Sequence, residues 1–307
     1  MGRGNIIRWF LVGLGYAIVV VHINKLSIIQ MKTDTTYKLG SEELLREGHL
    51  ALQSQINVIE NSFRKLLKSN DELALNLYTL LFSVYDSCKT ILILAPHYKV
   101  RDSFLTARTI YELTLNIGYI GAGGQEALNN AKKHLQQKSY RDLQRQLNIE
   151  SINISVKTLG IENLTISKEL QNALDEFTTK KGFEVRSWTG DNVFSKIEII
   201  SRKYGLKIKD ILNIGLFNIY RHASEIAHGT LFGLFYIIGA TEFKKRPQDT
   251  HELLILHRQH LTLIILTICL LIEANLTFMN EFADLSEEIK QSEKITLDFS
   301  NMTKQNE

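Results

Sequence analysis

Apolar residues recur at helical spacing through most of the chain, and this pattern constrains the fold more than any other feature. In residues 41–66 they return every three, four or seven positions behind Ser41 and two glutamates, which is typical of an amphipathic helix and its N-cap. A capping box at 69–72 opens a second, apolar run that ends at Pro96, one of only two prolines. Further helical patterns cover residues 102–124, 125–147, 167–181, 192–204, 207–240 and 250–282. The sequence has no internal repeat and no strand–turn–strand pattern, so we predict an all-α, multi-helix bundle.

Two apolar runs are the predicted centre of the core. The run at 72–95 is apolar on nearly every side, which predicts a central buried helix. Residues 261–272, between His260 and Glu273, carry no charge. This run is shorter than the roughly 20 residues that a bilayer span needs. It therefore predicts a core helix rather than a membrane span.

Three segments interrupt or end the helical pattern. The glycine-rich segment 121–124 closes a helix rather than opening one, so we interpret it as a C-terminal cap and not as a phosphate loop. Residues 148–165 lose the helical periodicity and predict a connector within a single helical domain, 38–283. The charged segment 284–307 has few apolar residues, which predicts a frayed polar tail.

An apolar segment lies within residues 1–30, with Trp9–Val21 at its centre and two arginines before it. It is short for a membrane span of about 20 residues, although apolar residues up to 29 lengthen it if Lys25 snorkels. Three interpretations stay open: a membrane anchor over 9–29, an apolar helix packed on the body, and upstream codons before a true start at Met31. A cleaved signal peptide is disfavoured because no small-x-small site follows.

Composition narrows the class of protein only in part. Thirty-six Lys and Arg against 33 Asp and Glu give a net charge of +3, which neither requires nor forbids a polyanionic partner. A mean hydropathy of -0.07 is too low for a protein with repeated membrane spans. Cys88 and Cys269 lie inside apolar runs, which predicts buried thiols rather than a disulfide or a metal pair. We expect a cytoplasmic protein, tethered to the inner membrane if the N-terminal segment is an anchor.

Polar side chains that carry chemistry gather at 220–230, Tyr-Arg-His-Ala-Ser-Glu-Ile-Ala-His-Gly-Thr. On a helix, Arg221 and His228 are nearly eclipsed, and Ser224 lies between them. Imidazole groups titrate near neutral pH, so His228 is a candidate general acid or base. A guanidinium binds phosphate through two donors, so Arg221 is a candidate phosphate stabiliser. The structural alternative pairs Arg221 with Glu225 and lets His228 cap a turn.

The Arg-x6-His spacing resembles the signature of the HEPN superfamily, with His222 in its polar slot. Over roughly residues 70–240 the chain is also similar to an uncharacterised bacterial domain family. Three blocks carry that similarity: Ala107-Arg108-x3-Glu112, Arg186-x-Trp188, and Tyr220-x3-Ser224-x3-His228-Gly229. The HEPN resemblance implies a helical bundle that dimerises and cleaves RNA with no metal or other cofactor, in bacterial stress or phage defence.

The similarity adds Arg108, Glu112, Tyr220, Arg186 and Trp188 as residues that support the site. Arg108 and Glu112 are one turn apart on an otherwise apolar helix, where charged residues are seldom buried unless they are paired. Two compatible interpretations follow: an ion pair inside the bundle, and an arginine oriented into the cleft beside the catalytic histidine. Trp188 either stacks on a base or fills the core.

We considered two metal sites and predict neither. The E-x-x-H at 225–228 is one half of a di-iron site, and the sequence holds no second copy. His251, His257 and His260 have basic neighbours and no cysteine nearby, which predicts an exposed, histidine-rich helix start. The basic run at 244–246 is a candidate for contact with a nucleic-acid backbone or with anionic lipid.

We therefore predict a metal-independent endoribonuclease with RNA as its ligand. The HEPN resemblance implies that it is assembled as a homodimer, and control by a regulatory partner protein stays open. Two alternatives remain. The first is a non-catalytic helical module that binds a nucleotide or a protein, with the Arg, Glu and His side chains as structural pairs. The second is a membrane-anchored effector whose N-terminal segment is the working part.

Overall fold

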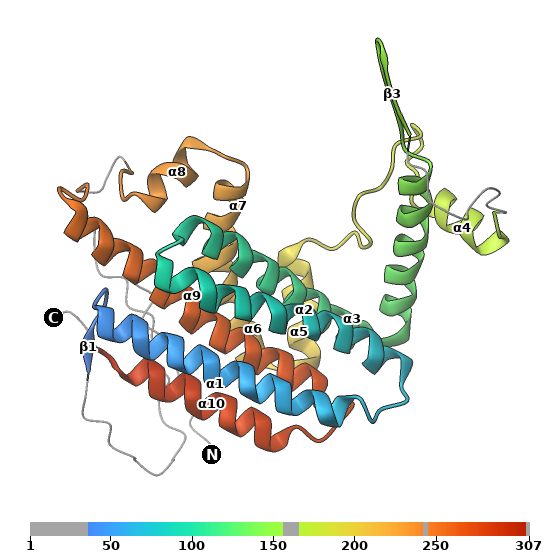
Figure 1. The fold of residues 1–307 in the computed structure, drawn as a ribbon. Coiled ribbons are helices and arrows are strands. Elements are labelled where there is room, and N and C mark those ends of the chain that lie inside the picture. Colours follow the sequence, from blue (N-terminus) through green and yellow to red (C-terminus); the bar gives the residue numbers. More distant parts are fainter. Residues whose placement is uncertain (1–35, 156–165, 242–244, 305–307) are drawn as a thin grey trace. The chain divides into compact units, whose positions relative to one another are not determined.

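The computed structural model describes residues 36–155, 166–241 and 245–304, and it confirms the predicted all-α, multi-helix bundle (Figure 1). Two short strand pairings accompany the helices. Strands β1 (Tyr37–Lys38) and β4 (Thr303–Lys304) pair in parallel, and β2 (Gln146–Ile149) and β3 (Ile152–Ser155) form an antiparallel hairpin. The apolar segment centred on Trp9–Val21 lies outside the described residues.

The chain divides into two compact units. The bundle unit comprises residues up to Ile117 and from Leu206 onward, and the inserted unit comprises Gly118–Gly205. The prediction of one domain over 38–283 stays a prediction. The helices of the bundle unit are α1 (Glu42–Leu66), α2 (Glu72–Leu94), the start of α3 (Val100–Leu143), α6 (Leu206–Gly215), α7 (Arg221–Ala227), α8 (Leu231–Ile237), α9 (Thr250–Met279) and α10 (Ser286–Asn301). The inserted unit contains the rest of α3, the hairpin, α4 (Lys168–Glu176) and α5 (Val193–Tyr204).

Side-chain caps fix where the long helices begin. The Ser41 hydroxyl accepts a hydrogen bond from the Leu44 amide at 3.2 Å, so α1 starts where the sequence predicts. The Asp71 carboxylate caps α2 in the same way, at 3.1 Å from the Ala74 amide. The predicted capping box has Ser69 as the N-cap, but the N-cap is Asp71, two residues later, whereas the helix ends just before the predicted stop at Pro96.

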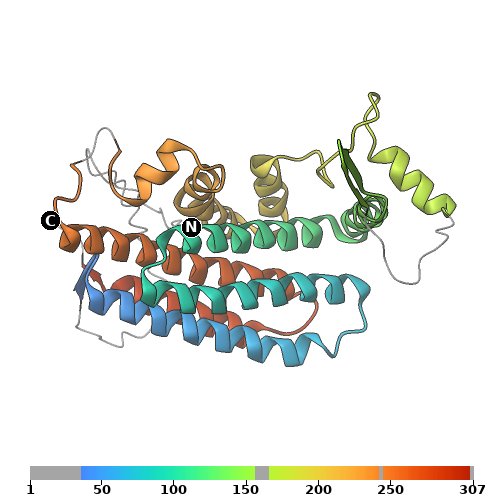
Figure 2. The same ribbon diagram turned by 45° about the horizontal axis from the view of Figure 1, so that its top comes forward.

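Helix α9 is the centre of the bundle unit. It packs against α1, α2, α6 and α10, and its run from Leu261 to Ile272 is buried over nearly its whole length, as predicted for a core helix. Figures 1 and 2 show α1 and α10 lying side by side along it. Each large apolar side chain removed from water there contributes about 1.5–3 kcal/mol, so this helix supplies much of the driving force for folding.

Helix α2 is buried on one face only, which corrects the prediction of a central buried helix. Its inner face is formed by Ala74, Leu77, Leu81, Val84, Cys88 and Ile91. Phe82 and Ile93 are exposed on the other side, at 49% and 67%. By length and composition, both α9 and the segment Glu72–His97 are capable of crossing a membrane. In α9, 83% of the most apolar 18-residue stretch is buried, whereas in Glu72–His97 the buried share is 28%. A buried core helix meets the same two criteria, so this observation is weak evidence for a membrane span.

The segment from Asp284 onward, predicted to be a frayed tail, forms α10 and then β4. Polar side chains occupy the buried face of α10. The Gln55 amide of α1 donates to the Ser292 carbonyl and to the Thr296 hydroxyl, at 2.9 Å each, and the Ser292 hydroxyl donates back to Gln55 at 2.8 Å. Because each of these buried groups has a partner, α10 docks on α1 without a continuous apolar stripe.

A second polar contact joins three helices of the bundle unit. The Lys207 ammonium of α6 lies 2.6 Å from the Glu273 carboxylate of α9 and 2.6 Å from the Glu293 carboxylate of α10. The Glu273 side chain is only 5% exposed, while the Lys207 side chain is 57% exposed. Burial raises the pKa of Glu273, and the neighbouring Lys207 acts in the opposite direction.

One prediction in this region is confirmed and another needs correction. The segment 121–124 does end a helix, because Gly124 has φ 61° and ψ -145°, and a second helical stretch continues from it to Leu143, close to the predicted end at 147. The β2–β3 hairpin covers the end of the predicted helix 125–147 and the start of the predicted connector 148–165, where we predicted no strand–turn–strand pattern. The hairpin was missed because each strand has only two apolar residues, Leu147 and Ile149 in β2 and Ile152 and Ile154 in β3, which is too short a run to distinguish a strand.

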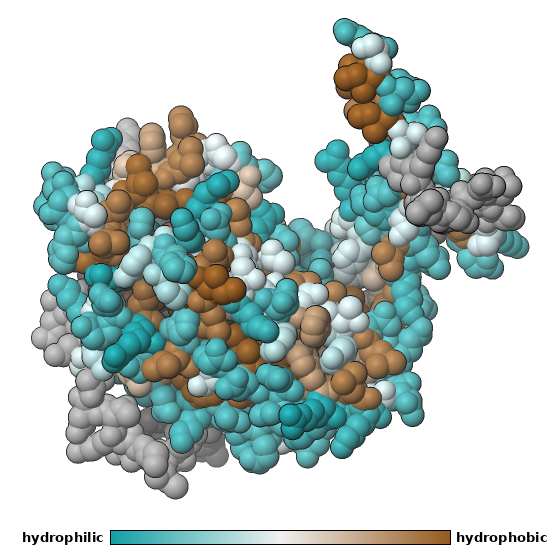
Figure 3. Space-filling view, in the orientation of Figure 1, coloured by the Kyte–Doolittle hydropathy of each residue, from teal (hydrophilic) through white to brown (hydrophobic). Residues whose placement is uncertain are grey.

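Helix α8 presents an apolar surface. Gly233 packs against the backbone of α7, where a Cβ would lie 2.7 Å from the Glu225 carbonyl. Gly233 and Tyr236 lie on the inner side of the helix, and several of its large apolar side chains are exposed. The exposed residues are Leu231, Phe232, Leu234, Phe235 and Ile238, and Figure 3 shows them as a brown patch over α8.

Candidate functional site

The predicted Arg-Ser-His face lies on α7, which is bounded by two local features. A π-helical turn, Leu216–Tyr220, precedes the helix, and such turns are frequent at functional sites. Gly215, just before the turn, packs on the buried Tyr111 ring so closely that a Cβ would lie 2.6 Å from it. His228 is the C-cap of α7, and Gly229 then turns the chain with φ 64°.

Arg221 and His228 are both exposed, and Ser224 between them is half-buried. Neither Arg221 nor His228 has a side-chain hydrogen bond or ion pair to any described residue. The structural alternative paired Arg221 with Glu225, but the Glu225 carboxylate instead accepts a hydrogen bond from the Thr230 hydroxyl at 2.8 Å. The same hydroxyl caps α8 by accepting from the Gly233 amide at 3.1 Å. Glu225 therefore stabilises the α7–α8 turn, and the Arg221 and His228 side chains face solvent.

Three of the supporting residues meet at one place in the bundle unit. The Arg108 Nε donates to the Glu112 carboxylate at 2.9 Å, within α3. The Arg108 guanidinium also lies 5.2 Å from the centre of the Tyr220 ring, and that ring packs on Tyr111 at 5.5 Å. The guanidinium thus connects the A-R-x3-E block to the first residue of the Y-x3-S-x3-H-G block. The predicted ion pair is present, but it is not inside the bundle, because 23% of the Arg108 side chain and 45% of the Glu112 side chain are exposed.

His222, the residue in the polar slot, has a structural environment that the sequence did not indicate. Its ring stacks on Tyr236 of α8 with the centroids 4.0 Å apart and the planes 7° apart. Tyr236 also contacts His260 at 4.8 Å, and Phe104 of α3 packs on all three rings. His260 is 5% exposed, so the predicted exposed, histidine-rich start of α9 is wrong at this residue. Sequence reasoning missed this cluster because its members come from four separate helices.

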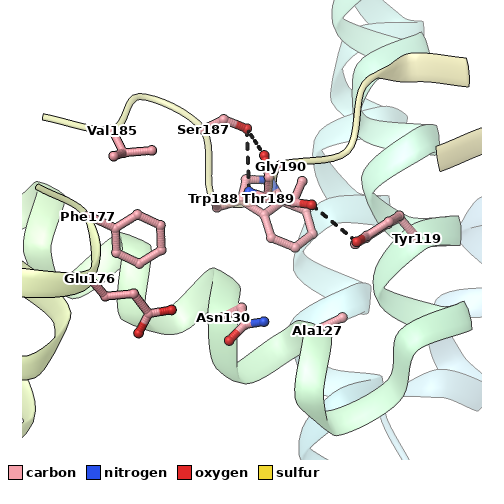
Figure 4. A pocket seen from close by; sticks show the side chains of 10 residues that line it. All are labelled: Tyr119, Ala127, Asn130, Glu176, Phe177, Val185, Ser187, Trp188, Thr189 and Gly190. Atoms are coloured by element: carbon pink, nitrogen blue, oxygen red, sulfur yellow. Dashed lines mark hydrogen bonds between the residues drawn. The ribbon is translucent and has the colours of Figure 1, made fainter. Parts of the chain in front are cut away.

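The other two supporting residues, Arg186 and Trp188, lie in the inserted unit. Arg186 is exposed, and Trp188 is half-buried in the loop between α4 and α5. Trp188 lines a pocket of about 340 Å³ whose walls are formed entirely by this unit (Figure 4). The lining residues are Tyr119, Ala127, Asn130, Glu176, Phe177, Val185, Ser187, Trp188, Thr189 and Gly190. The sequence singled out Trp188 but gave no signal for the pocket, because three segments far apart in the chain form it.

Hydrogen bonds of Tyr119 hold the loop that carries Trp188. The Tyr119 hydroxyl donates to the Asp191 carboxylate at 2.6 Å and lies 3.2 Å from the Thr189 hydroxyl. Burial, followed by the hydrogen bond to Asp191, raises the pKa of Tyr119, so the phenol keeps the proton that it donates. Within the described residues, no three His, Cys, Asp or Glu side chains are grouped so as to hold a metal ion.

The fold and these sites define an all-helical protein with a solvent-facing Arg-x6-His helix and a separate aromatic pocket. The chain belongs to the family of unknown function DUF5677, whose model matches residues 75–245 and thus more than half of the chain. This match confirms the expected membership of an uncharacterised family, over nearly the expected range. A search of curated proteins found no match, and a search of solved structures found none.

Proposed function

We propose that this protein is a metal-independent endoribonuclease in which Arg221 and His228 act on the scissile phosphate. The observation that carries the proposal is the state of these two side chains: both are exposed on α7 and neither is bonded to a described residue. The carboxylate one turn from Arg221 has another partner, since Glu225 accepts a hydrogen bond from Thr230. A guanidinium and an imidazole are thus available to a ligand at this surface.

The chemistry needs one phosphate ligand and at least one group that moves a proton. In RNA cleavage by transesterification, the ribose 2′-oxygen forms a bond to phosphorus and the bond from phosphorus to the 5′-oxygen breaks. His228 would take the proton of the 2′-hydroxyl or give one to the leaving 5′-oxygen. Arg221 would bind the non-bridging oxygens as negative charge accumulates on them. The products are a 2′,3′-cyclic phosphate and a 5′-hydroxyl end.

The resemblance to the HEPN superfamily extends this proposal to the biological setting. It supports a homodimer as the active form, a role in bacterial stress or phage defence, and control by a regulatory partner protein. The Arg108–Glu112 pair then has a positioning role, because Arg108 lies against Tyr220 at the turn that leads into α7.

An RNA digestion assay tests the proposal with two matched pairs of variants. General acid–base groups typically contribute about 10²–10⁴-fold in rate, so His228→Ala should reduce cleavage by about that factor. Loss of the phosphate contact in Arg221→Ala should cost about 10²–10³-fold. His251→Ala and Arg101→Ala alter an exposed histidine and an exposed arginine of the same unit and should cleave as the wild type does. Cleavage should persist in EDTA, and undiminished cleavage by His228→Ala would rule the proposal out.

A non-catalytic binding module is the second candidate, and the Arg108–Glu112–Tyr220 contacts favour it, because they give both charged residues of the A-R-x3-E block a partner within the protein. This candidate predicts that the wild type cleaves no RNA. It also predicts that His228→Ala changes thermal stability and no activity. Circular dichroism of the same His228→Ala sample, run beside the digestion assay, separates the two candidates.

A further inference from the structure

The pocket of the inserted unit has the size of a small-molecule site. Its volume of about 340 Å³ lies at the lower end of the roughly 300–1,000 Å³ typical of ligand sites. The second half of α3 contributes Ala127 and Asn130, the end of α4 contributes Glu176 and Phe177, and the loop at 185–190 closes the remaining side (Figure 4). A flat ring with a few polar atoms fits such a pocket better than a long or bulky ligand does.

Trp188 forms one wall, and its position is fixed before any ligand binds. Its ring packs edge-on against Tyr119 with the centroids 5.4 Å apart. The Lys196 ammonium lies 5.1 Å from the Trp188 ring and 5.5 Å from the Tyr119 ring. Tyr119 belongs to α3 and Lys196 to α5, so these two helices hold the indole in place while it also lines the pocket. An indole held in this way offers a stacking surface at little cost in side-chain entropy.

Phe177 lies on the opposite side of the pocket from Trp188, as Figure 4 shows. Its ring is 5% exposed and packs edge-on against His134 at 5.0 Å, so this wall is also held in place. A planar ligand between the two walls would contact one aromatic ring on each side. Stacking of this kind is how proteins recognise the bases of single-stranded nucleic acids.

Asn130 supplies the polar edge. Its side chain lies between the two aromatic walls in Figure 4, and it makes no hydrogen bond to any residue that the structure describes. The other polar groups of the lining are engaged: the Glu176 carboxylate accepts from Lys133 at 3.0 Å, and the Ser187 hydroxyl donates to the Thr189 carbonyl at 2.6 Å. A carboxamide offers one acceptor and two donors, the set that pairs with N6 and N7 of adenine.

We infer that this pocket binds a nucleobase, with adenine preferred, stacked against Trp188 and read by Asn130. The base would come either from a free nucleotide or from a single strand of RNA. Exposed Arg186 beside the pocket and the Lys196 ammonium supply positive charge for the attached phosphate. The inference rests on the proposed function only for the choice of RNA as one source of the base.

The sequence offers a direct spectroscopic test, because Trp9 and Trp188 are the only tryptophans. In the full chain carrying Trp9→Phe, the emission reports Trp188 alone. We expect adenosine monophosphate or single-stranded oligo(A) to quench this emission to saturation, and the uridine counterparts to need about tenfold higher concentrations. Saturation by the mononucleotide identifies a free nucleotide as the source, and saturation by the oligonucleotide alone identifies RNA.

Two matched variants in the Trp9→Phe background test the roles of the lining. Asn130→Ala should weaken adenine binding about tenfold, whereas Asn129→Ala, its exposed neighbour on α3, should not change it. Phe177→Leu should weaken binding, whereas Phe183→Leu, which alters an exposed ring of the same unit, should not. Equal effects within either pair would refute the inference, and so would emission that no nucleotide or oligonucleotide changes.

RNA cleavage and adenine binding are measured independently, so this inference and the ribonuclease proposal can fail separately. If RNA cleavage is never observed but adenine still quenches Trp188, the nucleobase pocket stands and the ribonuclease proposal fails. If the protein cleaves RNA and Asn130→Ala and Trp188→Ala bind adenine as the parent does, measured by calorimetry, the pocket inference fails alone.

Discussion

Replacing Lys207 by methionine tests how the bundle unit tolerates a buried carboxylate. The ammonium of Lys207 is 2.6 Å from Glu273, whose side chain is 5% exposed, and 2.6 Å from Glu293, whose side chain is 39% exposed. Methionine keeps much of the length and apolar character of lysine but removes its charge. The substitution therefore leaves Glu273 ionised in the core with no cation beside it.

The expected cost follows from the exposure of the pair. Removing one partner of a fully buried ion pair costs roughly 3–5 kcal/mol, because the remaining charge stays desolvated. Lys207 is 57% exposed, so water can partly replace its ammonium beside Glu273. We therefore expect Lys207→Met to lower the free energy of unfolding by about 2–3 kcal/mol at neutral pH.

The pH dependence has a definite sign. In the folded state the pKa of Glu273 is raised above its ordinary value of 4.5, chiefly by burial, and Lys207 opposes that rise. A carboxyl with a raised pKa contributes stability that is present below the unfolded pKa and is lost as pH rises through the folded pKa. Without Lys207 the pKa of Glu273 rises further, so the deficit of the variant should grow above pH 4.5 and shrink below it.

Urea denaturation followed by far-ultraviolet circular dichroism measures this deficit at neutral and at acidic pH. Lys290→Met removes a pair with Glu287 whose side chains are 70% and 80% exposed, and it should leave the free energy of unfolding almost unchanged. Adding Glu273→Gln to Lys207→Met removes the unpaired charge and should recover most of the loss. A deficit that is the same at both pH values would refute the reasoning.

The remaining predictions concern packing and thiol chemistry. Gly215→Ala should lower the free energy of unfolding by about 1–3 kcal/mol in thermal or urea denaturation, because its Cβ would lie 2.6 Å from the fully buried ring of Tyr111. Gly190→Ala, which has nothing within 4 Å, is the control, and equal stability of the two variants would contradict the packing argument. Burial raises the pKa of Cys269 to about 12 and also raises that of Cys88, so a thiol reagent at neutral pH should modify neither residue until denaturant is added. Rapid modification of the folded protein would show that the two thiols are not buried.

The helices that the sequence predicts well are those whose buried face is apolar. Helix α1 has its stripe and its Ser41 cap, and α9 has an uncharged run between His260 and Glu273, so local patterns suffice for both. Helix α10 was missed because Gln55 satisfies the polar residues on its buried face, and that partner is more than two hundred positions away. Helix α2 was misjudged for the opposite reason, since apolar residues such as Phe82 lie on its exposed face.

In the candidate sites too, contacts within one helix could be predicted from the sequence, and contacts between separate elements could not. The contact of Arg108 with Glu112 joins residues one turn apart, so spacing alone predicts it. The stacking of His222 on Tyr236 depends on how α7 and α8 pack, which spacing does not determine. The pocket around Trp188 depends on α3, α4 and a loop meeting in one unit, so it could be described only from the structure.

The order of the helices also has a consequence for synthesis on the ribosome. Helix α1 is made before its packing partners α9 and α10, and α9 begins roughly 180 residues after α1 ends. At about 5–20 residues per second, the apolar stripe of α1 waits roughly 10–40 s for its final partners. Of the three helices that pack against α1, only α2 has been synthesised during that interval. The nascent bundle unit therefore presents an incomplete core to water and to chaperones.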